Sequence, residues 1–358
     1  MKAARYYGRG DVRIEEVPAP GEPGEGEVLL QVLRAGICGT DVAEFLHGPH
    51  FVPLQEPHPF SGHRGPLILG HEFMGRLVAC GPGVEGLTPG QRVAVGAGMW
   101  CGECRWCQAG RTNLCARYYT LGLQADGGLA ELARVPARMC YPVPEDCSDE
   151  AAALAQPLAI ALHALRRSRA RRGETIALIG VGGIGAFLLA AARALEPSLL
   201  IAVDVDERRL ARAAALGASH LVRAGSEDVL RELRRLTDGE GPDLVIEASG
   251  APSAPALALA AAQRGGRLLL VGLQAEPRAL DLHTAVIREV EILTTNAHVC
   301  PIDLPEALAL LRQSELAAQV IERVIPLERL VPDGLLAMAE GRAYGKILLD
   351  PQAEARAG

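Results

Sequence analysis

The chain has 358 residues, of which 49% are hydrophobic, and its formal net charge at pH 7 is -7. This length allows two domains with separate hydrophobic cores, and the apolar content excludes a disordered chain. The negative charge excludes a broad basic surface, so we do not expect nucleic-acid binding. The N-terminal sequence MKAARYYGRG carries no apolar leader, which predicts a cytoplasmic protein. Nine cysteines in such a protein indicate metal binding or catalysis before disulfides.

Residues 1 to about 147 contain short alternating apolar runs separated by glycine and proline. The runs are typical of strands in a compact β domain, and they cover Val28–Leu33, Phe73–Val78, Arg92–Val95 and Leu129–Val135. The segment His47–Pro66 is rich in proline, glycine and histidine, and we expect it to be a loop. Its histidines lack the compact spacing of metal ligands.

A helical pattern begins near Ser148. This serine can accept a hydrogen bond from the first turn, and the two acidic residues that follow it favour a helix N-terminus. Pro157 interrupts the pattern, because it cannot donate a backbone hydrogen bond and disfavours helix at the preceding residue. Gln156 is therefore expected at a helix junction, where its side chain can turn into a cleft.

The stretch from Glu174 to Asp204 has the pattern of a dinucleotide-binding unit. A buried strand is predicted at Thr175–Ile179, followed by a GVGGIG turn, an Ala/Leu-rich helix and a second strand that ends at Asp204. The turn lets the backbone approach a pyrophosphate, and the helix N-terminus offers unpaired N–H groups to it. Asp204 is placed to accept from ribose hydroxyls. The turn residues expected to bind the cofactor are Gly180, Val181, Gly182, Gly183, Ile184 and Gly185.

A membrane span is the alternative for part of this stretch. Thr175–Ala192 has 18 residues without a charge, the minimum length for crossing a bilayer. Four glycines within six positions favour a turn over a continuous helix, and Arg193 follows directly. We therefore predict no membrane association.

Strand-like runs alternate with helical segments after the glycine-rich turn, at Leu199–Val203, His220–Val222, Leu244–Glu247, Leu268–Val271 and Val290–Thr294. Together with the first strand they make six, the number in a doubly wound parallel sheet of the α/β class. The tail contains helical segments at Leu304–Leu311 and near Leu335–Ala339 and a closing strand at Lys346–Leu349, and we expect it to return to the first domain. The predicted domains are residues 1–153, 154–296 and this returning tail, 297–358.

Four cysteines with the spacing C-x2-C-x2-C-x7-C form the strongest local signal: Cys101, Cys104, Cys107 and Cys115. Four thiolates at this spacing can close a tetrahedron around zinc without long-range help. The site would have no open position, so it is expected to be structural and to add on the order of 10 kcal/mol to folding. An iron–sulfur cluster is the alternative, because the first three cysteines share the ferredoxin spacing. The late fourth cysteine, with no proline after it, favours zinc.

A second group of ligand types is spread along the chain. Cys38, Thr40 and Asp41 lie in the segment ICGTD, and His71 and Glu72 lie in GHE. Beside a dinucleotide domain they predict an open zinc site with one thiolate, one imidazole and room for water or substrate. Asp41 could hydrogen-bond the imidazole, and Glu72 is either a ligand or a close neighbour.

Taken together, these motifs resemble the zinc-containing medium-chain dehydrogenases over almost the whole chain, most closely the polyol, threonine and 2,3-butanediol dehydrogenase branch. The resemblance is carried by GICGTD (36–41), GHE (70–72), the cysteine lobe, QPLAIALHA (156–164), GVGGIG and Asp204. The stretch 56–75 is especially similar to butanediol dehydrogenases. The resemblance implies a GroES-like β-rich catalytic domain, a Rossmann domain, a cleft between them, and a homodimer or homotetramer.

The resemblance also implies the reaction, in which NAD oxidises a secondary alcohol, a vicinal diol or polyol, reversibly to the ketone. Zinc held by Cys38 and His71, with Gln156 or Glu72 nearby, would bind the alcohol oxygen and lower its pKa. Thr40 would accept the hydroxyl proton and pass it toward the ribose and solvent, and the alcohol carbon would give hydride to the nicotinamide.

Several residues are expected to hold the cofactor. Asp204 predicts NAD, because a carboxylate repels a 2′-phosphate. The neighbouring Arg209, like Arg208, could instead meet a phosphate. Gly272 and Leu273 end a strand and are expected to line the nicotinamide pocket. Ser249 and Asn296 are weaker candidates for the same pocket.

Two departures from the family pattern fall in the active site. Gln156 stands where many relatives have Glu, and Ala43 stands where many have a histidine that relays protons. They leave two alternatives: a dehydrogenase of a bulkier cyclic or terpenoid alcohol, and a redox-inactive relative that binds nucleotide. The retained Cys38, Thr40 and His71 favour an active enzyme.

Overall fold

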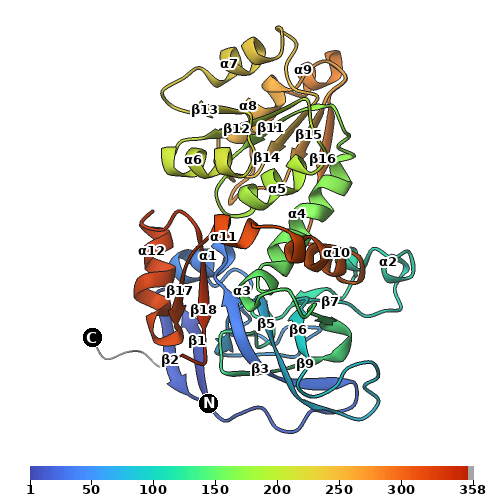
Figure 1. The fold of residues 1–358 in the computed structure, drawn as a ribbon, viewed down its shortest axis with the longest axis vertical. Coiled ribbons are helices and arrows are strands. Elements are labelled where there is room, and N and C mark those ends of the chain that lie inside the picture. The colour runs from blue at the N-terminus through green and yellow to red at the C-terminus, as the bar shows by residue number, and fades with distance from the viewer. Residues whose placement is uncertain (354–358) are drawn as a thin grey trace. The chain divides into compact units, whose positions relative to one another are not determined.

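The computed structural model describes residues 1–353 and divides the chain into two compact units (Figure 1). The first unit comprises residues 1–159 together with the chain from Val299 onward, and the second comprises Ile160–His298. The C-terminal segment therefore belongs to the same unit as the N-terminal residues. Among residues 1–353, no helix combines the length and the apolarity needed to cross a bilayer.

The first unit is built on a mixed sheet in the order β10-β6-β5-β3-β18-β17, with β9 also paired to β3, and on a small sheet β2-β1-β4. In the central strand β3 (Glu27–Gly36) most residues alternate between buried and partly exposed, the pattern of a strand with one face on the core. The other elements are β1 (Lys2–Gly8), β2 (Asp11–Glu16), α1 (Gly39–His47), β4 (Leu67–Ile68), β5 (Glu72–Cys80), β6 (Arg92–Val95), β7 (Gly98–Met99), α2 (Arg105–Gln108), β8 (Tyr119–Thr120), β9 (Leu132–Pro136), β10 (Cys140–Pro142), α3 (Asp149–Ala152), α4 (Ala155–Ser168, crossing into the second unit), α10 (Cys300–Gln313), α11 (Leu316–Val320), β17 (Ile321–Pro326), α12 (Leu336–Ala339) and β18 (Lys346–Asp350).

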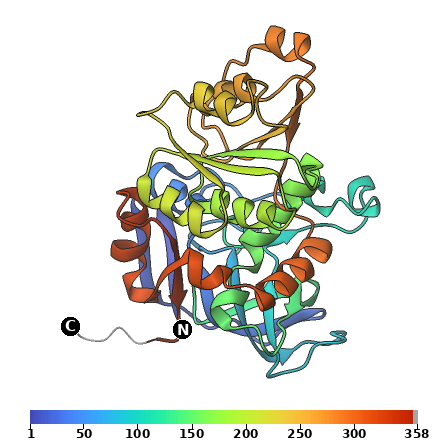
Figure 2. The ribbon, with the colours of Figure 1, turned by 45° about the horizontal axis from the view of Figure 1, so that its top comes forward.

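The second unit contains a six-stranded parallel sheet in the order β13-β12-β11-β14-β15-β16, which confirms the doubly wound prediction. Figure 2 shows α5 and α6 (green) on one side of this sheet and α7 to α9 (yellow to orange) on the other. The bounds are β11 (Thr175–Ile179), α5 (Gly183–Arg193), β12 (Leu199–Asp204), α6 (Glu207–Ala215), β13 (His220–Arg223), α7 (Val229–Leu236), β14 (Leu244–Glu247), α8 (Ala254–Ala261), β15 (Arg267–Leu270), α9 (Leu282–Ile287) and β16 (Glu291–Thr294).

Each strand run predicted from the sequence overlaps an observed strand, although some ends differ. Ser148 accepts a hydrogen bond from Ala151 N at 3.1 Å, which confirms the predicted cap of α3. The predicted strand Leu129–Val135 is wrong at its start, because β9 begins at Leu132. Leu129 N instead donates to Leu69 O at 2.9 Å, in a different chain pairing. No helix was predicted at 39–47, where the structure has α1.

Candidate functional site

Three strands bring the open group of metal-ligand residues together. Gly36, the last residue of β3, pairs with Glu72 at the start of β5 and with Leu348 of β18. Cys38 comes two residues after the end of β3 and His71 directly precedes β5, so the antiparallel register brings them close together. The ligand atoms of Cys38, His71 and Glu72 all lie within 4.8 Å of one another.

Helix α1 orients the cysteine and the histidine. Cys38 is the N-cap of α1, and its backbone N–H donates to Asp41 Oδ2 at 2.8 Å. The other carboxylate oxygen of Asp41, which is fully buried, lies 3.6 Å from His71 Nδ1. That separation is longer than a hydrogen bond, so the predicted bond to the imidazole is not formed, although the carboxylate lies next to Nδ1. Because Nδ1 faces Asp41, Nε2 is the histidine nitrogen left for a metal.

Negative groups surround this histidine. Burial lowers the pKa of His71, but the nearby Asp41, Cys38 and Glu72 outweigh it and raise the pKa to about 10. In the absence of a metal, a protonated His71 would compensate these negative groups, and a bound divalent cation would compensate them instead. The donor set of one thiolate, one imidazole and a carboxylate is one that zinc accepts.

Glu72 has a partner that the sequence motifs did not indicate. Its Oε2 is ion-paired with Lys346 Nζ, and the two side chains are 3% and 10% exposed. Lys346 Nζ also donates to the carbonyl oxygen of Ile37 at 2.9 Å. Because its carboxylate is paired with the Lys346 ammonium, Glu72 lies beside Cys38 and His71 as a neighbour whose charge is compensated.

Gln156 and Thr40 complete the group in this unit. Gln156 lies in the first turn of α4, so the predicted loss of helix at this residue is wrong, although the break between α3 and α4 directly precedes this turn. Its side chain is buried, yet no described residue donates to its Oε1. A buried amide oxygen without a donor is the kind of atom that a metal or its water satisfies. Thr40 Oγ1 lies 3.7 Å from Cys38 Sγ at the start of α1. The residues present therefore fit an open zinc site.

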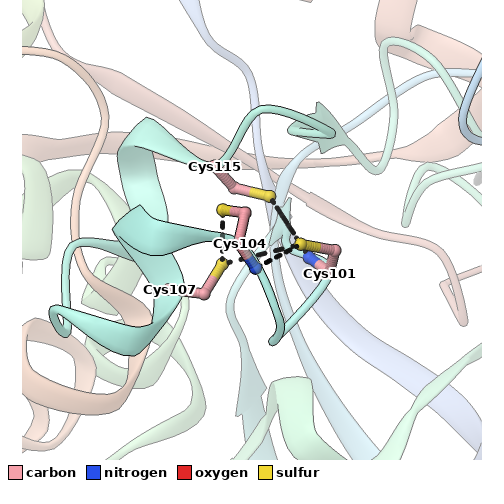
Figure 3. A group of neighbouring side chains, drawn as sticks. All are labelled: Cys101, Cys104, Cys107 and Cys115. Atoms are coloured by element: carbon pink, nitrogen blue, oxygen red, sulfur yellow. Dashed lines mark hydrogen bonds between the residues drawn. The ribbon is translucent and has the colours of Figure 1, made fainter.

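The cysteine lobe brings its four sulfurs to one point (Figure 3). Cys101 Sγ lies 3.5 Å from Cys115 Sγ and 3.9 Å from Cys107 Sγ, and Cys104 Sγ lies 3.6 Å from Cys107 Sγ. A tetrahedral zinc with bonds of about 2.3 Å sets its sulfurs about 3.8 Å apart. The spacing fits a single ion. A cluster binds its cysteines to different irons and needs wider spacing.

Backbone N–H groups favour the ionised form of two of these thiols. The N–H groups of Cys107 and then Ala116 lower the pKa of Cys104 to about 6, and backbone donors likewise lower the pKa of Cys101. Burial and the neighbouring thiols instead raise the pKa of Cys107 to about 12. Four thiolates so close repel one another, and a dication would remove that repulsion.

The glycine-rich turn in the second unit has the geometry expected of a dinucleotide site. Gly180 has φ of 89°, a conformation that favours glycine. A Cβ on Gly185 would lie 2.0 Å from Gly180 O, so only glycine lets α5 start this close to β11. Gly182 is the N-cap of α5, and no side chain caps its free N–H groups.

Asp204 is anchored at the end of β12. Its Oδ2 accepts from Val181 N at 2.9 Å and its Oδ1 from Asp206 N at 3.0 Å, which ties the two turns together. Each oxygen retains acceptor capacity for a ribose hydroxyl. Arg209 Nη1 lies 3.8 Å from Asp204 Oδ1, and its guanidinium lies beside the Cα of Gly182.

The remaining predicted cofactor residues follow the parallel strands at one sheet edge. Gly272 and Leu273 follow β15, Ser249 follows β14, and Asn296 follows β16. Leu273 is 80% exposed, so no described residue covers it. Ser249 packs against Gly180 and hydrogen-bonds to Glu247, a buried residue that the motifs did not indicate.

Comparisons with known proteins agree with this geometry. The model of the alcohol dehydrogenase GroES-like domain matches residues 24–145, and the zinc-binding dehydrogenase model matches residues 183–313. The (R,R)-butanediol dehydrogenase of Neisseria gonorrhoeae is 32% identical over 98% of this chain and 99% of its own. The sorbitol dehydrogenase of Bacillus subtilis is 34% identical over 82% of this chain and 80% of its own.

Solved structures give the same result. The crystal structure of 2R,3R-butanediol dehydrogenase from Bacillus subtilis superposes with a TM-score of 0.91, at 30% identity, over 98% of this chain and 99% of that one. A zinc-binding dehydrogenase from Sinorhizobium meliloti bound to NADP superposes with a TM-score of 0.86, at 30% identity, over 98% and 99%. This chain therefore belongs to the zinc-containing medium-chain dehydrogenase family, in the branch of the sorbitol and butanediol dehydrogenases, and acts on CH–OH donors with a nicotinamide dinucleotide.

Proposed function

We propose that this chain catalyses the reversible, NAD-linked oxidation of a vicinal diol or polyol, similar to 2,3-butanediol, to the hydroxy ketone. The observation that carries the proposal is the group of Cys38, His71 and Glu72, whose ligand atoms lie within 4.8 Å of one another; His71 and Glu72 are buried and Cys38 is partly exposed. Relatives named butanediol and sorbitol dehydrogenases support the substrate class.

Catalytic zinc would be held by Cys38 and His71, with Gln156 or Glu72 as the further ligand. When bound, it supplies Lewis acidity toward the alcohol oxygen. Thr40 Oγ1, next to the cysteine sulfur, would accept the hydroxyl proton and pass its own proton on toward the ribose and solvent. The dinucleotide, when bound, would supply the hydride acceptor. The Lys346 ammonium fixes the carboxylate of Glu72 and compensates its negative charge, so this carboxylate has a weaker electrostatic effect on the reacting hydroxyl. A second, structural zinc is proposed in the cysteine lobe.

The dinucleotide is proposed to be NAD and to lie along the carboxyl edge of the parallel sheet. The free N–H groups at the start of α5 suit its pyrophosphate, and Asp204 suits the adenosine ribose. Gly272, Leu273 and Ser249 are proposed to line the nicotinamide half. Arg209 is proposed to contact the adenosine side.

A homodimer or homotetramer is part of the proposal. Strand β16 is an end strand of its sheet, and the neighbouring α9 exposes Leu282, Val286 and Ile287. An uncovered strand edge beside exposed apolar side chains suits a second copy of the chain. Light scattering measures the mass directly, and a monomer at micromolar concentration would contradict this part.

Turnover with a panel of alcohols tests the proposed activity. The panel contains the stereoisomers of 2,3-butanediol, sorbitol, threonine and a cyclic secondary alcohol, each with NAD and zinc-loaded protein. We expect the highest kcat/KM with a butanediol isomer. Cys38→Ser should lose turnover but still bind NADH. Faster oxidation of the cyclic alcohol would support the bulkier substrate class, and NADH binding without any turnover would support the redox-inactive alternative.

A further inference from the structure

The carboxylate of Glu247 is buried at the carboxyl edge of the parallel sheet, outside all the sequence motifs. Glu247 is the last residue of β14 and is 0% exposed. Its Oε1 accepts three hydrogen bonds from the turn that follows: from Ser249 N at 2.7 Å, Ser249 Oγ at 2.6 Å and Gly250 N at 2.9 Å. The side chain thus folds back and fixes this turn.

The same residue holds the turn after the next strand. The carbonyl oxygen of Glu247 accepts from Val271 N at 2.8 Å and from Gly272 N at 3.0 Å. A Cβ on Gly272 would lie 2.6 Å from Glu247 Oε2 and 2.4 Å from Gly250 N. Only glycine at 272 therefore lets the turns after β14 and β15 pack together.

The fixed turn also contacts the glycine-rich turn on its other side. A Cβ on Gly180 would lie 2.6 to 2.7 Å from the Cβ, Cα and N atoms of Ser249. Because β11, β14 and β15 are neighbours in the sheet, three consecutive carboxyl-end turns meet around one carboxylate. Asp204 lies on the far side of β11, at the end of β12, and receives no bond from Glu247.

No described residue donates to Glu247 Oε2. Burying a carboxylate oxygen without a partner is costly, and such groups are usually kept where a precise arrangement is needed. Because Oε1 accepts three hydrogen bonds from the Ser249–Gly250 turn, it fixes the turn in one arrangement. A neutral or shorter side chain would accept weaker or fewer bonds and would fix the turn less firmly.

We propose that Glu247 is a positioning residue that holds the turns after β11, β14 and β15 in the arrangement that receives the nicotinamide half of the dinucleotide. The adenosine half, on the Asp204 side, does not depend on it. This inference rests on the proposed binding of the cofactor along this sheet edge.

Binding of NADH and of AMP to Glu247→Ala separates positioning from general stability. NADH should bind about tenfold more weakly, the change expected for losing the net effect of one charge-assisted hydrogen bond. AMP, which reports the adenosine half alone, should bind within about twofold of the wild-type affinity on this argument. Glu247→Gln keeps an acceptor oxygen of the same reach and should recover part of the NADH affinity.

Asp243→Ala is the matched control. Asp243 caps the other end of the same strand, where its carboxylate accepts from Thr175 N at 2.8 Å and from Gln263 Nε2 at 2.6 Å. This variant should lower the melting temperature without changing NADH affinity. If Glu247→Ala does not fold, the NADH-to-AMP affinity ratio of Glu247→Gln decides.

The two proposals fail in different ways. Wild-type protein that binds no NADH would overturn the proposed function and, with it, this inference. Wild-type binding of NADH with unchanged affinity in both Glu247 variants would overturn the positioning role alone. Equal losses of AMP and NADH affinity, or an equal loss of NADH affinity in Asp243→Ala, would also overturn it.

Discussion

Lys346 and Glu72 form a buried ion pair beside the Cys38 and His71 ligand atoms, although they are far apart in the sequence. The ammonium also bonds the carbonyl of Ile37, the residue before the cysteine. A Cβ on Gly36 would lie within 3 Å of both side chains, so the pair is closely enclosed. The pair therefore sets both the charge and the shape of the wall behind the open site.

Lys346→Met should destabilise the protein by about 3–5 kcal/mol, because removing one partner leaves a buried carboxylate uncompensated. Denaturant unfolding measures this difference. Lys2→Met is the control, since Lys2 is the chain's other lysine and its pair with Glu328 is partly exposed. It should cost at most about 1 kcal/mol. Adding Glu72→Gln to Lys346→Met should recover much of the loss, and additive effects would contradict the pairing.

Cys104→Ser should remove one of two zinc ions per chain and lower stability, with any loss of activity following unfolding. The reason is that a closed four-cysteine site holds the lobe together but has no position for substrate. Elemental analysis and thermal unfolding measure the two effects. Cys80→Ser, outside both groups of ligands, is the control. A stable, fully active variant that lacks one zinc would show that the lobe is not structural, and bound iron would support the cluster.

Acid should weaken zinc binding in the cysteine lobe as the pH falls through about 6. The folded-state pKa of Cys104, about 6, is lower than the ordinary value of 9.0. The thiolate's contribution is therefore present in full above pH 9 and is lost as the pH falls through about 6. The zinc affinity of the lobe, measured by competition with a chromophoric chelator, checks this, and an affinity that does not fall through this pH range would contradict it.

Thr40→Ala should lower turnover by roughly 10²-fold or more, the lower range for losing a positioned proton-transfer group. The effect is expected to be large because Ala43 offers no imidazole behind it. NADH affinity should stay nearly unchanged, and Thr40→Ser should retain most activity. Near-normal turnover of Thr40→Ala would mean that water or His47 carries the proton, which His47→Ala would then reveal.

NAD should be clearly preferred over NADP, because the Asp204 carboxylate repels a 2′-phosphate. Arg208 is already held by Asp206, with Nη2 to Oδ2 at 2.9 Å, and so competes poorly for a phosphate. The ratio of kcat/KM values measures the preference. Asp204→Asn should reduce the preference for NAD, and comparable kcat/KM values for both cofactors in the wild type would contradict this prediction.

Gln156→Glu should shift the pH dependence of alcohol oxidation to the alkaline side. The variant adds one negative charge to a buried site, and a more negative site disfavours ionisation of the reacting hydroxyl. It should also hold zinc more tightly, because the carboxylate compensates the metal charge. A pH–rate profile of the zinc-loaded variant measures the shift. An unchanged or acid-shifted profile would show that Gln156 does not tune the site.

Features whose parts are close along the chain could be predicted from the amino-acid sequence alone. The glycine-rich turn, its flanking strand and helix, and Asp204 lie in one short unit, and the four lobe cysteines lie within one loop. Local backbone geometry and ligand spacing are enough to specify such features. The pairing of Cys38 with His71 was also predicted, from their ligand types beside a dinucleotide domain and from the family resemblance, although the two residues have no compact spacing.

The charged side chains that contact these motifs could not be predicted, because the three-dimensional fold determines which of them come close. Lys346 meets Glu72 because β18 joins β3 in the sheet, and no local pattern encodes that pairing. Its one visible signal is that a chain with 36 basic residues has only two lysines. Glu247 reads as the end of a strand, and its role depends on turns brought together by strand order. Such contacts arise from sheet register between distant segments, which a single sequence does not specify.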